Sequence, residues 1–511
     1  MHGQSERETF SAPLLGDDHS SDISSHVESL VGVSNEQDQP MRRSSFEVFE
    51  EIRKLYAIAL PLIVTALVVH GKSVISALFL GRIGKEALAG VTLAIGIANI
   101  TGYSVITGLA LGMEAITSQA CGARRWPLMV QTLQRTITIL TLASVPISVL
   151  WFNVEPILLL CGQDPKMVSV AAVYLTYAIP DLFFQSLINP LRIYLRSQNI
   201  TIPLMLSAGF GLLLHAPINY LLVHHYKLGV KGIAMALSTT DLTILAVLVL
   251  CIYFSSTCRE SWQAWSLKCF KEWSTILWLA IPSCISVCLE WWWYELMIVL
   301  AGVLPNAAEA VGAMGVLIQA TALIYIFPSS LGLAVSARVG NELGAARPEC
   351  ARATSLVALA CAVATSLVVM LFTVVMRTTW GRFFTRDEAI LALTAAALPV
   401  VGLCELGNCP QTTVCGALRG SARPALGANI NLVAFYFVGL PVAGVMCFKI
   451  GMGLLGLWMG LLAAQGVCAV VMVVMLMRTD WAAEARKARE LTGDAAEQGD
   501  GGGENCDERP K

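Results

Sequence analysis

The nonapeptide AITSQACGA (Ala115–Ala123) returns in the second half of the chain as ARVGNELGA (Ala337–Ala345). Both copies share the pattern Ala-x-x-x-Gln/Asn-x-x-Gly-Ala. Other marks recur in the same order at nearly the same offset: Ala59-Leu60-Pro61 with Ala280-Ile281-Pro282, Leu195-Arg196 with Leu418-Arg419, and Gly229-x-x-Gly232 with Gly453-x-x-Gly456. A duplicated apolar unit with ordered polar and glycine marks is typical of transporters built from two repeats.

The composition places most of this chain in lipid. Of its 511 residues, 56% are hydrophobic and only 14% are charged, whereas soluble domains carry about a quarter charged residues. A net charge of -2 gives no case for a nucleic-acid partner. The fifteen cysteines show no CxxC or Cys/His ligand spacing, so we expect packing residues and neither a metal nor a cofactor. No HExxH or Ser/His/Asp arrangement lies in the apolar stretches, and we expect no enzyme.

Twelve apolar stretches are long enough to cross a bilayer core, which needs about 20 helical residues. They cover residues 55–80, 88–111, 129–152, 167–190, 202–223, 230–254, 275–303, 310–334, 353–376, 387–416, 424–448 and 452–477. Because each half holds an even number of spans, both halves have the same orientation. The sequence therefore predicts an all-α membrane protein of twelve transmembrane helices in two six-helix lobes, related by a pseudo-two-fold axis along the membrane normal.

The predicted organisation has five parts. They are a disordered cytoplasmic N-terminal tail (1–50), an N-lobe with spans one to six (51–254), a cytoplasmic inter-lobe loop (255–274), a C-lobe with spans seven to twelve (275–478) and a cytoplasmic C-terminal tail (479–511). Lysine and arginine are more frequent on the side that holds both termini, which predicts that this side is cytoplasmic. No feature specifies an oligomer, so we expect a monomer surrounded by membrane lipid.

Span seven carries two carboxyls, Glu290 and Glu295, on either side of Trp291-Trp292-Trp293-Tyr294. A charge in the bilayer core is costly unless it has a role, and the exchange of a proton is such a role. A spacing of five residues places the two carboxyls about 140° apart on an ideal helix. We therefore expect one to line a cavity and the other to lie in a hydrogen-bonded pocket between helices. The alternative is that both are structural.

Span ten carries Glu405, Asn408, Gln411 and Thr412 at spacing i, i+3, i+6 and i+7, with Pro410 among them. This is a polar stripe on one helix face. Proline removes a ladder bond, so a bent helix with a free carbonyl could form a binding element. The alternative, hydrogen bonding between helices, is open for Asn408 and Gln411, whereas Glu405 is a further proton-coupling candidate.

The remaining candidates are single polar residues, one in span seven and the others in spans not yet described. We expect them to line the substrate cavity: Lys72, Asn99, Asp181, Tyr294 and Gln319. Lys72 has two further interpretations, because it could snorkel to the membrane surface or pair with Glu290 or Glu405 across the cleft. Asp181 and Asp241 each have a plausible structural role, and Glu114 is expected to pair with a nearby arginine.

Several of these stretches resemble the multidrug and toxic compound extrusion (MATE) family, and within it the plant DETOXIFICATION proteins. The resemblance covers about residues 50–480. It rests on Ala59-Leu60-Pro61, SVISALFLGRIG (Ser73–Gly84), residues 88–122, Leu289-Glu290-Trp291-Trp292, VGNELGA (Val339–Ala345), Gly416-x-x-Arg419-Gly420 and Gly427-Ala-Asn-x-Asn431. The resemblance implies a two-lobed antiporter that exchanges small organic molecules for protons, with the coupling carboxyl at Glu290 and Glu295 beside it.

The chain departs from the family pattern at two places. Plant relatives often have an aspartate in span ten where this chain has Asn408, so Glu405, one turn away, is the alternative second protonation site. The span-one carboxylate of prokaryotic relatives is absent, and His70 and Lys72 occupy that region, which argues against sodium coupling through the N-lobe.

The predicted function is proton-coupled antiport of small organic molecules by alternating access, at the plasma membrane or an endomembrane such as the vacuole, late endosome or Golgi. Organic cations, secondary metabolites, xenobiotics and hormones all remain open as substrates. The alternative is a lipid-linked or polyprenyl-type flippase of the same superfamily. A flippase would need a basic cleft for a phosphate head group, whereas the polar residues singled out above are mainly acidic or neutral.

Overall fold

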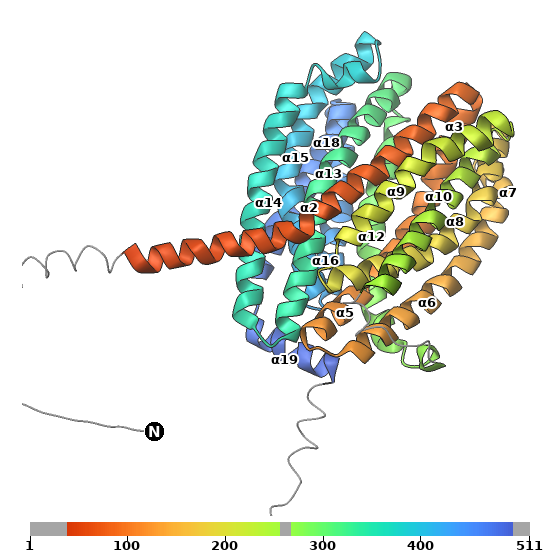
Figure 1. Cartoon of the computed structure of the whole chain (residues 1–511). Helices are drawn as coiled ribbons and strands as arrows, with labels where there is room; N and C mark the ends of the chain where they lie inside the picture. Colours follow the sequence, from red (N-terminus) through yellow and green to blue (C-terminus); the bar gives the residue numbers. More distant parts are fainter. Residues whose placement is uncertain (1–37, 256–266, 494–511) are drawn as a thin grey trace, which may run out of the picture. The chain divides into compact units, whose positions relative to one another are not determined.

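The computed structural model describes residues 38–255 and 267–493. Within these ranges every regular element is helical, and twelve helical segments are long and apolar enough to cross a membrane (Figure 1). Of the described residues, 38–53 belong to one unit, and 54–255 with 267–493 belong to a second unit, which holds the membrane-spanning core. The prediction of an all-α membrane protein with twelve spans is confirmed.

In the described part of the chain, six spans fall in each half. The first half contains α2 (Asp38–Ile83), α3 (Lys85–Ala98), the π-helical turn η1 (Asn99–Tyr103), α4 (Ser104–Leu111), α5 (Met113–Gly122), α6 (Trp126–Phe152), α7 (Val154–Leu160), α8 (Pro165–Ser197), α9 (Ile202–Asn219), η2 (Tyr220–His225) and α10 (Val230–Phe254). The second half contains η3 (Leu267–Phe270), α12 (Ser274–Ala301), α13 (Ala307–Gly344), α14 (Pro348–Met376), η4 (Trp380–Phe383), α15 (Glu388–Gly420), α16 (Pro424–Asn431), η5 (Leu432–Gly439), α17 (Leu440–Gly444), η6 (Val445–Lys449), α18 (Leu454–Met477) and α19 (Trp481–Thr492).

Several helices are longer than the apolar stretches that predict them. Helix α2 begins at Asp38, within the stretch expected to be a disordered tail, and α8 continues to Ser197, past the expected end at residue 190. The expected tail residues 1–37 and 494–511 and the loop residues 256–266 lie outside the described residues. Hydropathy finds the lipid-embedded part of a helix, whereas hydrogen bonding continues the helix into polar sequence.

The repeated glycines have the same structural role in each half. Gly229 precedes α10 with φ 56° and Gly453 precedes α18 with φ 56°, a backbone conformation that favours glycine. Three residues later, a Cβ on Gly232 would lie 3.1 Å from the carbonyl oxygen of Leu222, and a Cβ on Gly456 would lie 2.5 Å from the amide nitrogen of Cys447. The two glycine pairs recur in the sequence because spans six and twelve both start with a tight, closely packed turn.

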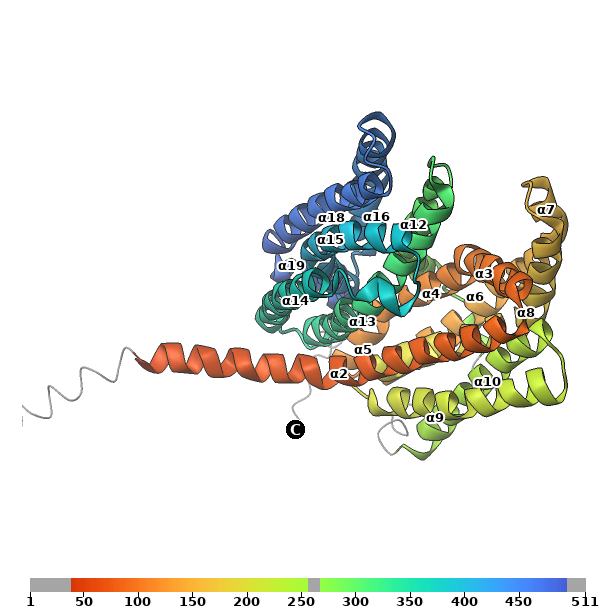
Figure 2. The same cartoon turned by 90° about the horizontal axis from the view of Figure 1, so that it is seen from above.

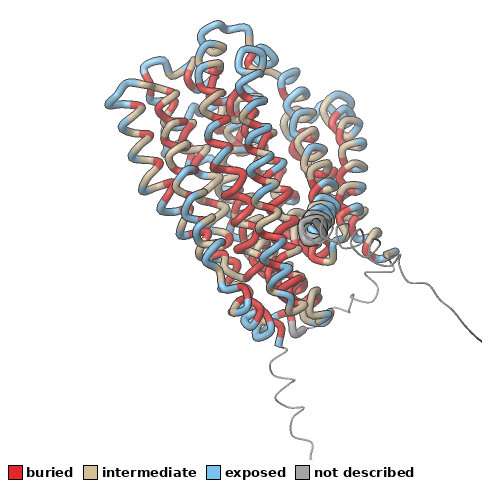
Figure 3. The backbone as a smooth tube through the Cα atoms, turned by 90° about the vertical axis from the view of Figure 1, so that its left-hand side faces the viewer, coloured by how far each residue is buried: buried red, intermediate tan, exposed pale blue. Residues whose placement is uncertain are grey.

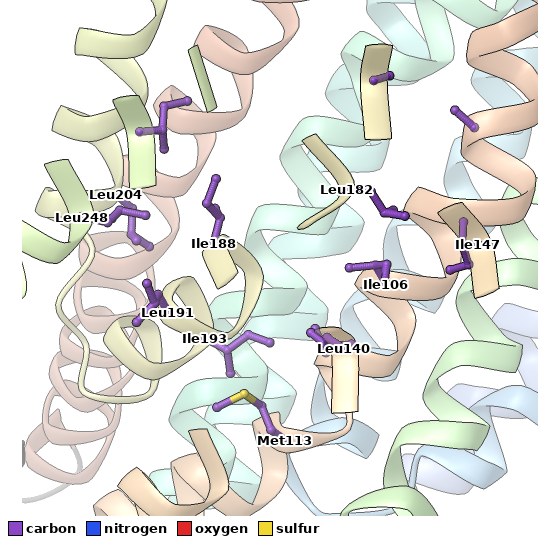
Figure 4. Close-up of a cluster of buried hydrophobic side chains, with 14 of the residues drawn as sticks. Ile106, Met113, Leu140, Ile147, Leu182, Ile188, Leu191, Ile193, Leu204 and Leu248 are labelled. Carbon is purple, nitrogen blue, oxygen red and sulfur yellow. The ribbon is translucent and has the colours of Figure 1, made fainter. Parts of the chain in front are cut away.

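The two lobes each have their own core, and they meet along a central seam. Figure 2 shows α14, α15, α16 and α18 on one side, α6, α8, α9 and α10 on the other, and α4, α5, α12 and α13 between them. Buried residues lie on the inward faces of the helices and exposed residues on the outward faces (Figure 3). In the N-lobe core, Ile106, Leu140, Leu182 and Ile188 are among the side chains that pack together (Figure 4).

Small residues let the helices at the seam approach closely. A Cβ on Gly108 would lie 2.6 Å from the Cα of Cys284, and one on Gly112 would collide with Ala280, so α4 and the residue that joins it to α5 contact the backbone of α12 directly. Small residues at such contacts are the usual means of helix association in membranes. The seam therefore positions α4, α5, α12 and α13 around whatever space remains between the lobes.

Candidate functional site

One end of the seam is closed by buried charges. Glu114 of α5 is 1% exposed. Its Oε1 accepts hydrogen bonds from Arg196 Nε at 3.1 Å and Nη2 at 2.6 Å, and its Oε2 lies 3.3 Å from Nε of Arg419 in the C-lobe. A carboxylate between two guanidinium groups holds both lobes together at this end. The structure thus gives Glu114 the arginine partner expected from the sequence, and adds a second one from the opposite lobe.

Next to this triad, the two copies of the repeated nonapeptide pack against each other. A Cβ on Gly122 would collide with the backbone of Asn341, and a Cβ on Gly344 would collide with the backbone of Gln119. The Gln119 side chain also donates through Nε2 to the carbonyl oxygen of Gly420 at 2.9 Å. We call these contacts, together with the Glu114 triad, the seal.

The short helix α19 covers the same end of the molecule. Trp481, Ala485 and Ala488 pack into a C-lobe cluster with α13, α14 and α15. Leu491, near its other end, packs against a cluster formed by α5, α6 and the start of α12. Glu484 lies 3.7 Å from Arg423 in the loop before α16. Helix α19 therefore contacts both sides of the seam beside the seal.

Beyond the seal, a cavity of about 270 Å³ lies between the lobes, and we call it the central cavity. Five spans of the C-lobe and N-lobe supply its charged and polar wall: Thr107, Asn189, Arg192, Arg196, Ser283, Ser286, Glu290, Tyr325, Ser329, Thr412 and Arg419. Apolar groups such as Leu111, Val287, Trp291 and Leu333 complete it. A space of this kind, mostly apolar with a few convergent polar groups, is the usual form of a small-molecule site.

A second cavity of about 210 Å³ continues along α12 on the side away from the seal. It is lined by Asn99, Ile100, Glu290, Trp291, Tyr294, Glu295, Ile318, Thr321, Ala322 and Tyr325. Three of these side chains, Glu290, Trp291 and Tyr325, line both cavities. They form the partition between the two spaces, and the tyrosine hydroxyl interacts with the carboxyl of Glu290.

Glu295 borders the second cavity as well, which differs from the expectation that only one of the two carboxyls would face a cavity. The second cavity has walls on both sides of α12, from η1 through Asn99 and from α13 through Thr321. Two carboxyls on different faces of α12 can therefore border the same space. A Cβ on Gly96 would lie 3.6 Å from the Glu295 carboxylate, so this glycine leaves room for the carboxylate beside α3.

The π-helical turn η1 places Asn99 at the second cavity. Thr101 and Trp151 hold the turn, because Trp151 Nε1 donates to Thr101 Oγ1 at 2.9 Å. From the opposite lobe, Trp292 donates to the carbonyl oxygen of Ile100 at 3.2 Å. Isolated π-turns within helices are frequent at functional sites.

The stripe on span ten is arranged differently from the prediction, because α15 packs closely between α13 and α18. Only Thr412 reaches the central cavity. Glu405 accepts a hydrogen bond from Asn408 at 2.9 Å, and both are 2% exposed. Gln411 donates to Asn431 at 3.1 Å, which in turn donates to Ser286 at the cavity wall at 3.1 Å. Asn408 and Gln411 thus lie behind the wall, in hydrogen bonds within and between helices.

Lys72 and Asp181 are also placed away from both cavities, inside the N-lobe. Lys72 Nζ lies 2.6 Å from Oδ1 of Asp241, and Gln185 donates to Oδ2 of the same carboxylate at 2.9 Å. Asp181 accepts a hydrogen bond from the hydroxyl of Tyr103 at 2.7 Å. Pairing with Glu290 or Glu405 was one interpretation left open for Lys72, and its ion pair is instead with Asp241 of its own lobe.

Gln319 is an exposed side chain of α13, and it lines neither cavity. Its neighbours Ile318 and Ala322 face the second cavity instead. The sequence could not decide this, because a single polar residue in an apolar span gives no periodicity from which a helix face can be read.

Sequence reasoning missed several polar cavity residues, among them Asn189, Arg192 and Tyr325. With Arg196 and Arg419, the central cavity has three arginines in its wall and one carboxyl, Glu290. The expectation of a mainly acidic or neutral midplane therefore needs correction. The signal was present in span four, since Asn189, Arg192, Ile193 and Arg196 follow the spacing i, i+3, i+4 and i+7 of one helix face.

Comparison with known proteins agrees with this architecture. The MatE family model matches residues 61–221 and 282–445, which is one segment in each lobe. Protein DETOXIFICATION 48 of Arabidopsis thaliana is 54% identical over 449 residues, covering 88% of this chain and 84% of that protein. Protein DETOXIFICATION 52 of the same plant is 49% identical over 472 residues, covering 92% and 93%.

Solved structures share the fold. The crystal structure of the eukaryotic MATE transporter AtDTX14 superposes with a TM-score of 0.84 at 31% identity, over 87% of this chain and 99% of that chain. An outward-facing multidrug resistance MATE family transporter of the MOP superfamily gives a TM-score of 0.75 at 16% identity, over 85% and 96%. The second likeness concerns the fold alone.

Twelve spans in two repeats, with a cavity at the interface between the repeats, define this molecule as a membrane transporter. Two findings specify the kind of transporter. The family model matches one segment in each half of the chain, and relatives are about half identical over most of their length. The chain belongs to the MatE family of multidrug and toxic compound extrusion transporters.

Proposed function

We propose that this transporter is a proton-coupled antiporter, which exports or sequesters small organic molecules by alternating access, and that Glu290 is its coupling carboxyl. The observation that carries the proposal is the position of Glu290 in the partition between the two cavities, where it lines both. A carboxyl in this position can meet a substrate in one space and exchange a proton through the other.

Competition between a proton and the substrate for the Glu290 carboxylate explains how proton movement is coupled to substrate transport. An ionised carboxylate in a cavity of low dielectric attracts a cationic or hydrogen-bond-donating substrate group, and protonation removes that attraction. Proton uptake from the acidic side therefore favours substrate release on that side. Tyr325 supports the exchange, because its hydroxyl interacts with the Glu290 carboxyl and can accompany either charge state as acceptor or donor.

Glu295 and Glu405 are the further proton-coupling candidates. Glu295 borders the second cavity and thus has access to the same space as Glu290. Glu405 is buried behind the wall with Asn408 and Cys409 as hydrogen-bond partners. We rank Glu295 before Glu405 as an auxiliary group, because a proton can reach Glu295 without any rearrangement of α15.

Alternating access needs a closure that can open, and the seal is suited to this role. With the orientation expected from the lysine and arginine distribution, both termini and the seal lie at the cytoplasmic face. Breaking the Glu114–Arg419 pair and separating the two nonapeptides would open the central cavity to the cytoplasm. The lobes would then move as bodies around a fixed site.

The substrate class follows from the relatives only in outline. The names of the relatives DETOXIFICATION 48 and 52 point to toxic compounds, a class that includes xenobiotics and many secondary metabolites. They do not point to lipid-linked sugars, so we favour small organic molecules over the flippase alternative. We place the protein in the plasma membrane or an endomembrane, as a monomer with both termini in the cytoplasm.

Proteoliposomes containing the purified full-length protein test the proposal. An imposed proton gradient, acidic inside, is followed with a pH-sensitive dye while organic cations, anions and zwitterions are added outside. We expect some compounds to collapse the gradient with the wild type and not with Glu290→Gln. Glu388→Gln is the matched control, since Glu388 is an exposed carboxyl at the start of α15. Equal collapse with Glu290→Gln would move the coupling to Glu295 or Glu405, and no collapse at all would end the antiport proposal.

A further inference from the structure

The guanidinium of Arg192 faces the central cavity, and it has no hydrogen-bond or ion-pair partner in the part of the chain that the structure describes. Arg192 lies on α8 on the same face as Asn189 and Arg196. Among the side chains that the structure describes (residues 47–84, 86–255 and 269–493), no carboxylate lies within ion-pair distance of Arg192 and no acceptor binds it. The carboxylate that acts on it electrostatically is Asp241, and both oxygens of Asp241 are already engaged by other donors.

The other charges of the cavity wall do not neutralise Arg192. Arg196 and Arg419 share the single carboxylate of Glu114, so this group of three carries a net positive charge. Glu290 is the only acidic residue among the described residues that line the cavity. The central cavity is therefore basic beside the seal and along α8, and acidic at the partition.

Such an arrangement is costly in an empty cavity. An arginine with five donors, in a space of low dielectric, gains much from an anion that satisfies it. Arginine is also the side chain best suited to bind carboxylates, because its planar fork can donate two parallel hydrogen bonds. Between the charged ends, Leu111, Val287, Trp291 and Leu333 offer an apolar wall for the body of a ligand.

We propose that Arg192 binds an anionic group of the substrate, and that the substrate is amphoteric: an apolar body with a carboxylate-like group at Arg192 and a cationic or donor group at Glu290. This inference rests on the proposed function for the role of Glu290 and adds the second end of the ligand.

Exchange against a proton requires the cationic end of such a ligand. A simple anion would bind more tightly when Glu290 is protonated, so it would travel with the proton instead of against it. A cationic group beside Glu290 reverses this relation, because it competes with the proton for the carboxylate. The anionic group then contributes affinity and orientation without disturbing the exchange.

Three ligands that share one aromatic ring system test the anionic end and the cationic end of the proposed substrate separately. We would measure equilibrium binding of 1-naphthoate, 1-naphthylmethylammonium and 1-naphthylalanine to the full-length protein in nanodiscs by isothermal titration calorimetry. The variants are Arg192→Gln, Arg192→Lys and Glu290→Gln, with Lys166→Gln as the control at an exposed position of the same helix. Thermal unfolding of each variant shows that it is folded.

We expect Arg192→Gln to weaken naphthoate and naphthylalanine binding roughly ten- to hundredfold and to leave naphthylmethylammonium unchanged. Arg192→Lys should restore part of the loss, since it keeps the charge but not the fork. Equal binding of naphthoate and naphthylalanine by wild type and Arg192→Gln, or a wild type that binds neither, would overturn the inference. Glu290→Gln reports on the proposed function separately, because it should weaken only the two ammonium-bearing ligands.

Discussion

Replacing Gly344 with alanine should prevent the seal from closing fully. A Cβ at this position would lie 2.7 Å from the carbonyl carbon of Gln119 and 2.8 Å from its Cα, both of them backbone atoms of the opposite lobe. Carbon atoms in van der Waals contact lie about 3.5–4.0 Å apart, so the lobes must separate by roughly 1 Å. Backbone atoms of a packed helix cannot give way as a flexible side chain can.

A separation of that size weakens two contacts across the seal. The Gln119–Gly420 hydrogen bond, now 2.9 Å, and the Glu114–Arg419 pair, now 3.3 Å, both pass beyond their useful range. Together these contacts contribute about 2–3 kcal/mol. The ratio of sealed to unsealed molecules should therefore fall by roughly 30- to 150-fold.

Hydrogen–deuterium exchange in nanodiscs measures this directly, because opening the seal exposes the amides at the ends of α5 and α13. We expect faster exchange in these segments for Gly344→Ala, and slower substrate turnover. Gly315→Ala is the matched control, since Gly315 lies on the same helix with no atom within 4 Å of an added Cβ. Equal exchange at the seal in the two variants would refute the steric reasoning.

Three further predictions concern the buried charges and α19. Glu114→Gln leaves two guanidinium groups without their counter-charge and should lower the unfolding midpoint by several degrees, at a cost of about 3 kcal/mol or more; an unchanged midpoint by scanning calorimetry would contradict this. Lys72→Met and Asp241→Asn should each destabilise the protein more than their combination does, and additive effects in this double-mutant cycle would show that the pair is not coupled. Deleting residues 481–511 should accelerate exchange at the start of α12, whereas deleting 494–511, which leaves α19 intact, should not; equal exchange in both truncations would remove α19 from the closure.

The membrane spans could be predicted because a single physical quantity, the hydropathy of a stretch of sequence, decides them. A helix in lipid must be apolar over about 20 residues, and every one of the twelve stretches satisfies this. The ends could not be predicted equally well, because α8 and α13 continue into sequence with arginine and glutamate. This limit had a consequence for the site, since span four was cut at residue 190 and Arg192 was thereby counted outside it.

A site residue could be predicted from the sequence only where its position in its own helix decides whether it lines a cavity. Glu290 and Asn99 line cavities because each is a polar residue in the interior of a span. The surroundings of Lys72 depend on which carboxylate of another span lies nearest, and α10 supplies Asp241. Likewise, the stripe on α15 faces other helices because α18 and α16 cover it. These are tertiary facts that no periodicity along one span contains.

The contact between the two nonapeptides has an evolutionary consequence. Gly122 meets Asn341 while Gly344 meets Gln119, so each copy of the repeat touches the other through equivalent positions. Such reciprocal contact is the hallmark of an isologous interface, as in a symmetric dimer. A half-length ancestor could have associated with a second copy of itself through this same surface before its gene was duplicated and fused. Covalent fusion then freed each copy to diverge, which is how one half could acquire Glu290 and the other Arg192.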